Sequence, residues 1–268
     1  MPLLKKLSAP LLKSSHEFIL LLTGGKPCLP NSQPWQAGLF SGFRLKCGGT
    51  LIHRSWVLSA AHCKMRTKAH RPATGYLSSM CLSMFLSRPF PVRLGEHDLK
   101  RVDWTEQLKL ASKAIVHPSY DPQTKNHDIM LVKLLTPAFY RLSSAVLQHL
   151  LGYKLDTSAL STICIFSLFP PIVTFPDVLH CANITIISHN ICQSIYPGYI
   201  NENMVCAGRM EGGTDTCQGD SGGNLVCNGK VQGIVSWGPQ ICAQPNKPGV
   251  YVNVCKYVEW IRETIANN

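Results

Sequence analysis

Short apolar stretches separated by polar turns dominate the chain, and they predict β-strands rather than long helices. Residues 35–63 divide into short strands with turns at Ser41-Gly42 and Gly48-Gly49. The run Trp56-Val57-Leu58 is typical of a buried strand, and so is Ile129–Leu135. We therefore expect an all-β core built from short strands.

The end of the chain carries two further patterns. Residues 225–238 predict a β-hairpin whose turn is Asn228-Gly229, a pair suited to a two-residue turn. Apolar residues then recur at i, i+4, i+7 and i+11, which predicts a helix over residues 254–265 with one apolar stripe. The stripe consists of Val254, Val258, Ile261 and Ile265. We expect this helix to dock on the body of the protein.

Two segments depart from the pattern. Residues 1–21 occupy the place of a secretion signal, but lysines interrupt them, and Phe18–Leu22 is too short for a signal core or a membrane span. We interpret 1–21 as a poorly formed leader or pro-segment. Residues 64–91 are basic, then rich in methionine and serine, and indicate an atypical insert. This insert is either a long surface loop or translated non-coding sequence.

Composition narrows the class of protein. A chain of 268 residues can form one all-β domain. Its net charge of +11 favours acidic partners such as sulfated glycans or anionic membranes. Because the positive charges are spread along the chain, a solvated basic surface is favoured over a nucleic-acid site. Twelve cysteines indicate an oxidising compartment, and the lack of a Cys-x-x-Cys pair argues against zinc.

Candidate chemistry centres on residues 212–223, where glycines surround Ser221 and allow sharp backbone turns. A serine needs an adjacent base to become a nucleophile. His62 is the candidate base, and Asp128 is the candidate acid that orients it. Asp128 precedes a buried strand, where an unpaired carboxylate would be unfavourable. Three other aspartates compete with it from polar, turn-like contexts: Asp98, Asp103 and Asp121.

Several motifs resemble the trypsin-like serine proteases, and these follow the His, Asp, Ser chain order of chymotrypsin-type enzymes. They are Leu58–Cys63, Asp128–Leu131, Gly219–Gly223, Ser236-Trp237-Gly238 and Lys247–Tyr251. Two more are similar to the kallikrein-related peptidases: Asn31–Gln36 and Cys255–Ile261. The resemblance covers roughly residues 22–268 and implies a protease domain of two six-stranded antiparallel β-barrels with a C-terminal α-helix. It implies no cofactor.

The resemblance also implies catalytic roles. Ser221 would attack the scissile carbonyl, His62 would take and return the proton, and Asp128 would hold the imidazole. The backbone amides of Gly219 and Ser221 would form the oxyanion hole. His127, beside the acid, is interpreted as an exposed neighbour.

Substrate-binding residues follow from the same resemblance. Asp215, six residues before Ser221, would form the floor of the primary specificity pocket and bind a substrate Arg or Lys. Gly238 and Gly249 would leave the pocket walls open. Ser236 and Trp237 would offer a strand edge to the substrate backbone.

Activation in the family frees an apolar N-terminal residue whose ammonium pairs with the aspartate beside the serine. The corresponding pair is Leu22 and Asp220. The residue before Leu22 is Leu21, not Arg or Lys, so cleavage by a trypsin-like enzyme at the usual bond is not expected.

The implied disulfides are Cys28–Cys181, Cys47–Cys63, Cys164–Cys227, Cys192–Cys206 and Cys217–Cys242. Cys81 and Cys255 remain, so Cys255 is either a free thiol or paired irregularly with Cys81. Other departures are Ser167–Pro171, which replaces Gly-Trp-Gly, and Asn224, which replaces a proline with an expected mild effect.

One loop corresponds to a calcium site of some trypsins and contains Glu96, Asp103 and Glu106. Because Lys100 and Arg101 lie among the acids, we favour solvated loop charges over calcium and expect no metal.

Two hypotheses of function remain. The first is a secreted, monomeric endopeptidase that cleaves polypeptides after Arg or Lys, meets protein inhibitors and is glycosylated at Asn183-Ile184-Thr185. The second is a catalytically silent homologue that binds peptides, inhibitors or acidic glycans. Its support is the absent activation site and the irregular segments. Partial mistranslation of an ordinary protease gene would reconcile the two.

Overall fold

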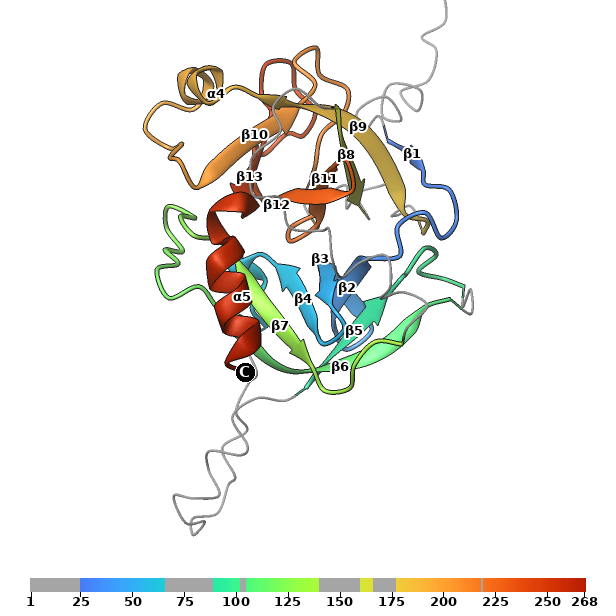
Figure 1. Ribbon diagram of the computed structural model, residues 1–268. Coiled ribbons are helices and arrows are strands. Elements are labelled where there is room, and N and C mark those ends of the chain that lie inside the picture. Colours follow the sequence, from blue (N-terminus) through green and yellow to red (C-terminus); the bar gives the residue numbers. More distant parts are fainter. Residues whose placement is uncertain (1–24, 66–88, 102–104, 140–159, 166–176, 218) are drawn as a thin grey trace, which may run out of the picture.

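The computed structural model describes residues 25–65, 89–101, 105–139, 160–165, 177–217 and 219–268, with the backbone alone for 160–165. Two β-barrels lie one above the other (Figure 1). The first is a closed barrel with strand order β2-β3-β4-β7-β6-β5. Its strands are β2 (Gln36–Ser41), β3 (Arg44–His53), β4 (Trp56–Ser59), β5 (Phe90–Leu94), β6 (Gln107–Val116) and β7 (Met130–Leu134).

The second barrel comes from a sheet with strand order β1-β9-β10-β13-β12-β11-β8, in which β8 also pairs with β9. That pairing closes a ring of six antiparallel strands, with β1 added at the edge of β9. The strands are β1 (Lys26–Pro27), β8 (Leu160–Ile165), β9 (His180–Ile187), β10 (Met204–Gly208), β11 (Asn224–Cys227), β12 (Lys230–Trp237) and β13 (Gly249–Asn253). The expectation of two six-stranded barrels is confirmed.

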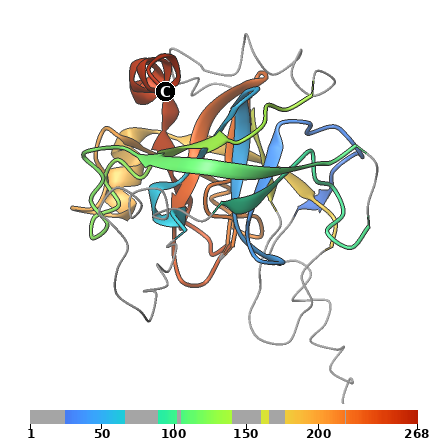
Figure 2. The same cartoon turned by 90° about the horizontal axis from the view of Figure 1, so that it is seen from below.

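Two α-helices occur in the described residues, and the C-terminal one confirms the predicted apolar stripe. The shorter helix is α4 (His189–Ile195); the turn η3 (Val254–Tyr257) leads into α5 (Val258–Ala266). Val258 and Ile261 are buried, and Ile265 packs against the core. The helix lies beside β7 (Figure 1) and outside the strands when seen nearly end-on (Figure 2).

Alternation of buried and exposed positions explains the strands. The core of the first barrel contains fully buried Leu51, Leu58 and Leu131, and residues of β11, β12 and β13 join the same apolar cluster. The predicted hairpin is confirmed, because Asn228 and Gly229 adopt φ values of 49° and 71° between β11 and β12. Both residues have the positive φ that the tight turn requires.

The predicted turn at Gly48-Gly49 is wrong, because both glycines lie inside β3. A Cβ at Gly48 would lie 3.0 Å from the backbone of Gly223, and one at Gly49 would lie 2.7 Å from Val57 Cγ1. The glycines therefore serve close packing between strands and loop, not chain reversal.

Four of the implied disulfides are present: Cys28–Cys181, Cys47–Cys63, Cys192–Cys206 and Cys217–Cys242. The fifth depends on the side chain of Cys164, which lies outside the described residues, as do Cys81 and residues 167–171. Cys255 Sγ lies 2.9 Å from Asn253 Oδ1 in a hydrogen bond. Among the described helices, none is long and apolar enough to cross a membrane.

Candidate active site

His62 is presented by a short turn that follows a buried strand. All four residues of β4 are buried, and η1 (Ala61–Cys63) turns the chain directly after them. The disulfide from Cys63 to Cys47 ties this turn to β3. The side chain of His62 keeps 20% of its surface exposed, so a substrate can reach it.

Asp128 holds His62 through two contacts. Its carboxylate is fully buried. Oδ1 accepts a hydrogen bond from the His62 backbone N–H at 2.9 Å, and Oδ2 lies 2.7 Å from His62 Nδ1. Because a carboxylate only accepts, Nδ1 carries the proton, and Nε2 of the neutral ring is left as an acceptor.

Ser236 completes this network in a way that the sequence did not indicate. Its Oγ donates to Asp128 Oδ2 at 2.6 Å, and the hydroxyl is buried. The sequence assigned Ser236 to the substrate-binding edge, where its backbone on β12 still lies. No local signal links residues 128 and 236, so only the fold reveals this contact.

The two competing acids that the structure describes do not hydrogen-bond to His62. Asp98 and Asp121 accept hydrogen bonds within their own turns, and Asp103 lies outside the described residues.

The loop that carries Ser221 is packed against the first barrel. The Gly48 N–H donates to the Ser221 carbonyl at 2.8 Å, and the Ser59 hydroxyl donates to the Gly48 carbonyl at 2.8 Å. Gly222 has φ of 81°, and a Cβ there would overlap Ser59 Oγ and the Gly48 carbonyl oxygen. A glycine is therefore required immediately after the serine.

Asn224, at the start of β11, adds a hydrogen bond between the barrels. Its Nδ2 donates to Gln36 Oε1 at 3.0 Å, and both side chains are buried. The substitution of asparagine for the implied proline thus introduces a contact between β11 and β2.

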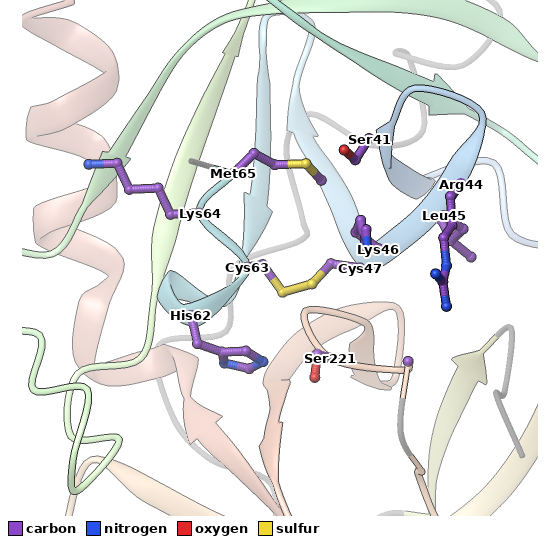
Figure 3. A pocket seen from close by; sticks show the side chains of 11 residues that line it. Ser41, Arg44, Leu45, Lys46, Cys47, His62, Cys63, Lys64, Met65 and Ser221 are labelled. Atoms are coloured by element: carbon purple, nitrogen blue, oxygen red, sulfur yellow. A yellow bond between two sulfur atoms is a disulfide. The ribbon is translucent and has the colours of Figure 1, made fainter. Parts of the chain in front are cut away.

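Ser221 and His62 line one cavity of about 500 Å³, together with Gly219 (Figure 3). The imidazole extends towards Ser221, whose side chain comes from the facing loop. No hydrogen bond joins the two side chains, although both belong to the described part of the chain. In unliganded enzymes such contacts are often long and tighten only when substrate binds.

The amides proposed for the oxyanion hole lie on the same loop. Gly219 has φ of 101°, which only glycine adopts readily. The N–H groups of Gly219 and Ser221 donate to no other residue that the structure describes. Both donors therefore remain available to a ligand.

Asp215 is buried in the second barrel with 2% of its surface exposed. Oδ1 accepts from the Thr216 N–H at 2.7 Å, and Oδ2 accepts from the Ala243 N–H at 3.4 Å. Burial raises the pKa of this carboxyl to about 6, while the backbone donors of Thr216, Ala243 and Gly249 act in the opposite direction. No described cation forms a salt bridge with it.

Two glycines leave space around this carboxylate. A Cβ at Gly249 would lie 2.9 Å from Asp215 Oδ1, so a side chain there would press on the acid. A Cβ at Gly238 would meet only the Gly249 Cα, at 3.7 Å. Trp237 lies beside them in an edge-to-face contact with Tyr196.

Comparisons with known proteins identify the family of the chain. The sequence model of the Trypsin family matches residues 22–261. The chain belongs to the trypsin family of serine endopeptidases.

Its relatives in this trypsin family include kallikreins. Kallikrein-15 of Saguinus oedipus is 42% identical, with 92% of each chain covered. Kallikrein-11 of Homo sapiens is 43% identical over 91% of this chain and 80% of the relative. A solved structure of neuropsin, described as a serine protease expressed in the limbic system of mouse brain, aligns with a TM-score of 0.75. It is 40% identical and covers 90% of this chain and 98% of its own.

Of the predicted activation pair in this trypsin-family chain, only Asp220 lies in the described residues. Asp220 is buried, and its Oδ2 accepts from the Cys217 N–H at 2.6 Å. Leu22 lies outside the described residues, so the pairing stays a prediction.

The interpretation of His127 as an exposed neighbour is wrong. Its ring stacks on His117 with centroids 4.8 Å apart, and the hydroxyl of Tyr257 lies 3.0 Å from its Nδ1. Burial, and secondly the neighbouring His127, lower the pKa of His117. The cluster joins the segment before Asp128 to the C-terminal turn η3.

The view of Glu96 as a solvated loop charge is also wrong. Its side chain is buried and pairs with Arg93 at 3.0 Å. Burial raises the pKa of Glu96 to about 7, against the opposing effect of Arg93. No cluster of three possible metal ligands occurs among the described residues, and Asp103 lies outside them.

Proposed function

We propose that this chain is a kallikrein-like endopeptidase that hydrolyses peptide bonds after Arg or Lys through an acyl-enzyme. One observation carries the proposal. The buried hydrogen-bonded series Ser236–Asp128–His62 ends at an imidazole that shares a cavity with Ser221. A nucleophile, a base and a group that orients the base are the parts that acyl transfer requires.

In the first half-reaction, Ser221 Oγ attacks the scissile carbonyl carbon while its proton passes to His62 Nε2. The carbonyl π electrons move to the oxygen and form an oxyanion. When this intermediate collapses, the C–N bond breaks and Nε2 gives its proton to the leaving amine. Water then repeats the sequence on the acyl-enzyme, with its proton passing through Nε2 to Ser221 Oγ, and the acid is released.

Asp128 acts by position and charge. It keeps the proton on Nδ1, so Nε2 can accept, and it stabilises the imidazolium that forms. The amides of Gly219 and Ser221 stabilise the oxyanion. Losing one such donor typically raises the barrier by roughly 2.7–4 kcal/mol.

Specificity rests on Asp215. A buried carboxylate without a cation is unfavourable, and a substrate guanidinium or ammonium supplies the missing charge. Gly238 and Gly249 leave room for a long side chain to approach, and the edge of β12 at Ser236 and Trp237 pairs with the substrate backbone.

The proposed setting is extracellular, with four described disulfides as support. Substrates are polypeptides, and regulators include protein inhibitors that occupy the same site of a monomer. Asn183 and Thr185 are exposed on one face of β9, which suits glycosylation of Asn183-Ile184-Thr185. Activation would free the Leu22 amine to pair with Asp220.

The second candidate is a catalytically silent homologue. Leu21 before Leu22, and the absence of a hydrogen bond between the described side chains of His62 and Ser221, favour it. Such a chain would bind peptides, inhibitors or acidic glycans without cleaving them.

The test is expression of the full chain and of residues 22–268 with a free Leu22 amine, assayed with Arg and Phe esters. We expect the 22–268 form to hydrolyse the Arg ester. Ser221→Ala should lower kcat by about 10⁶-fold. A fluorophosphonate probe, which labels only an activated serine, separates lack of activity from unsuitable substrate.

Failure of both esters and of the probe, in a folded sample, would establish the silent homologue. Labelling with hydrolysis of the Phe ester alone would leave the protease intact and refute the role of Asp215.

A further inference from the structure

The cavity beside Ser221 and the carboxylate of Asp215 are surrounded by different barrels. Asp215 is enclosed by second-barrel residues, including Ala243 and Gly249. The cavity is walled instead by the first barrel, from the β2–β3 turn and from the segment around the Cys47–Cys63 disulfide. Figure 3 shows the disulfide between the β3 wall and the turn that carries His62.

Among the residues that the structure describes, three cations and no acidic residue line this cavity. They are Arg44, Lys46 and Lys64, all exposed. None of them forms a salt bridge with any residue in the described ranges. The cavity wall therefore carries positive charge that the protein does not neutralise there.

The local backbone places two of these cations together. Phe40 pairs with Leu45 and Leu39 pairs with Cys47, which leaves Lys46 as the extra residue of a β-bulge. A bulge redirects the side chain of the inserted residue. Lys46 and Arg44 line the same cavity on one side of the disulfide. Lys64 lies on the other side, and its side chain extends away from Ser221.

We propose that this cavity binds the one or two residues that follow the cleaved bond and selects acidic side chains there. The inference rests on the proposed protease function. A substrate whose basic side chain reaches Asp215 places its scissile carbonyl at Ser221. Because the cavity at Ser221 is lined by the first barrel and Asp215 lies in the second, we assign the next residues of the extended chain, about 3.3 Å each, to the cavity beside the disulfide, Arg44 and Lys46.

The size of the effect follows from the exposure of the cations. A single partly exposed ion pair changes an equilibrium by roughly 1.5- to 5-fold. With two cations close to the chain, we expect kcat/KM to be about 10-fold higher for glutamates than for lysines after the cleaved bond, with alanines between them. Salt at about 1 M, where the Debye length is about 3 Å, should remove most of this preference.

The test uses internally quenched peptides with a common Arg before the bond and Glu-Glu, Ala-Ala or Lys-Lys after it. The enzyme is the form that hydrolyses the Arg ester. Because the ester has no residue after the bond, its hydrolysis reports the proposed function independently. The double variant Arg44→Gln, Lys46→Gln should lose most of the preference, and Lys64→Gln should lose less. Lys230→Gln, at the exposed first residue of β12, is the matched control.

A preference that survives in the double variant, or equal kcat/KM for the Glu and Lys peptides of the unaltered enzyme, would overturn the inference while the ester still supports the protease. If the ester is not hydrolysed, the same peptides, fluorescently labelled, are titrated against Ser221→Ala. The Glu peptide should then bind about 10-fold more tightly than the Lys peptide, and equal Kd values would again refute the inference.

Discussion

Asp128 and Asp215 are both buried carboxylates, but their surroundings differ in kind. Asp128 accepts from the backbone and ring of His62 and from the Ser236 hydroxyl, so the protein itself supplies a group that can become cationic. Asp215 accepts from backbone amides and Thr216, all neutral donors. The first region is electrostatically complete without substrate, whereas the proposed function has a cation of the substrate complete the second. The proposed function therefore assigns catalysis and specificity to different regions.

Of these two regions, the Asp128 region should show the larger effect when it is disrupted. In Asp128→Asn the amide can donate to Nδ1, which moves the ring proton to Nε2 and prevents it from accepting the serine proton. We expect kcat for the Arg ester to fall by about 10⁴-fold. The measurement is kcat together with a thermal melt. A fall of less than 10-fold in a folded variant would show that Asp128 does not orient the base.

Removing the Asp215 carboxylate should reduce hydrolysis of basic substrates only. Asp215→Ser removes the buried partner of the substrate cation, so kcat/KM for the Arg ester should fall by about 10³-fold. Hydrolysis of the Phe ester and labelling by the fluorophosphonate should change little. An equal loss on both esters would indicate that Asp215 supports the fold and not specificity.

The pH dependence of KM for the Arg ester provides a further test of the role of Asp215. Because the pKa of Asp215 is raised to about 6, the carboxyl becomes neutral as pH falls through that value. Binding of the Arg ester should weaken about 10-fold for each further pH unit, seen as a rise in KM. Asp215→Ser should lack this rise. A KM that stays constant from pH 7 to 5 would contradict the assignment.

The raised pKa of Asp215 should also make the free energy of unfolding depend on pH. Its pKa is raised from the ordinary 3.8 to about 6 by folding, so the native state holds the proton more tightly than the unfolded chain. Its contribution is fully present below pH 4 and is lost as pH rises to 6, a change of about 3 kcal/mol. Urea unfolding of the wild type and Asp215→Ser across this range should show the variant gaining relative stability as pH rises.

The parts predicted from sequence are those that depend on local chemistry. The Asn228-Gly229 turn and the α5 stripe need only short-range backbone preferences and periodicity, and both are confirmed. The four described disulfides followed from the family resemblance. The contact between His62 and Asp128 was predicted from the order of the motifs, although the two residues are distant in the chain.

The parts that sequence missed depend on contacts between distant segments. Gly48 suggested a turn because its partner, the 222–223 backbone, is distant in the chain. His127 lies in a polar stretch, and its contacts with His117 and Tyr257 cover it partly. The Ser236 hydroxyl is missed for the same reason.

Ser236→Ala is the mildest way to disturb the Asp128 region. It removes one of the hydrogen bonds to the buried carboxylate and leaves both contacts with His62. A hydrogen bond to a charged group typically contributes about 1.5–3 kcal/mol, so we expect a loss of about 2 kcal/mol in the free energy of unfolding and a fall of a few-fold in kcat. With one donor fewer, the Asp128 charge acts more strongly on the imidazolium, so the acid limb of kcat/KM should move to higher pH.

Ser59→Ala, which removes a buried hydroxyl bonded to the neutral Gly48 carbonyl, is the control and should lower stability without moving that limb. A stability loss with an unmoved acid limb in Ser236→Ala would reduce the hydroxyl to a structural support and leave Asp128 to act through His62 alone.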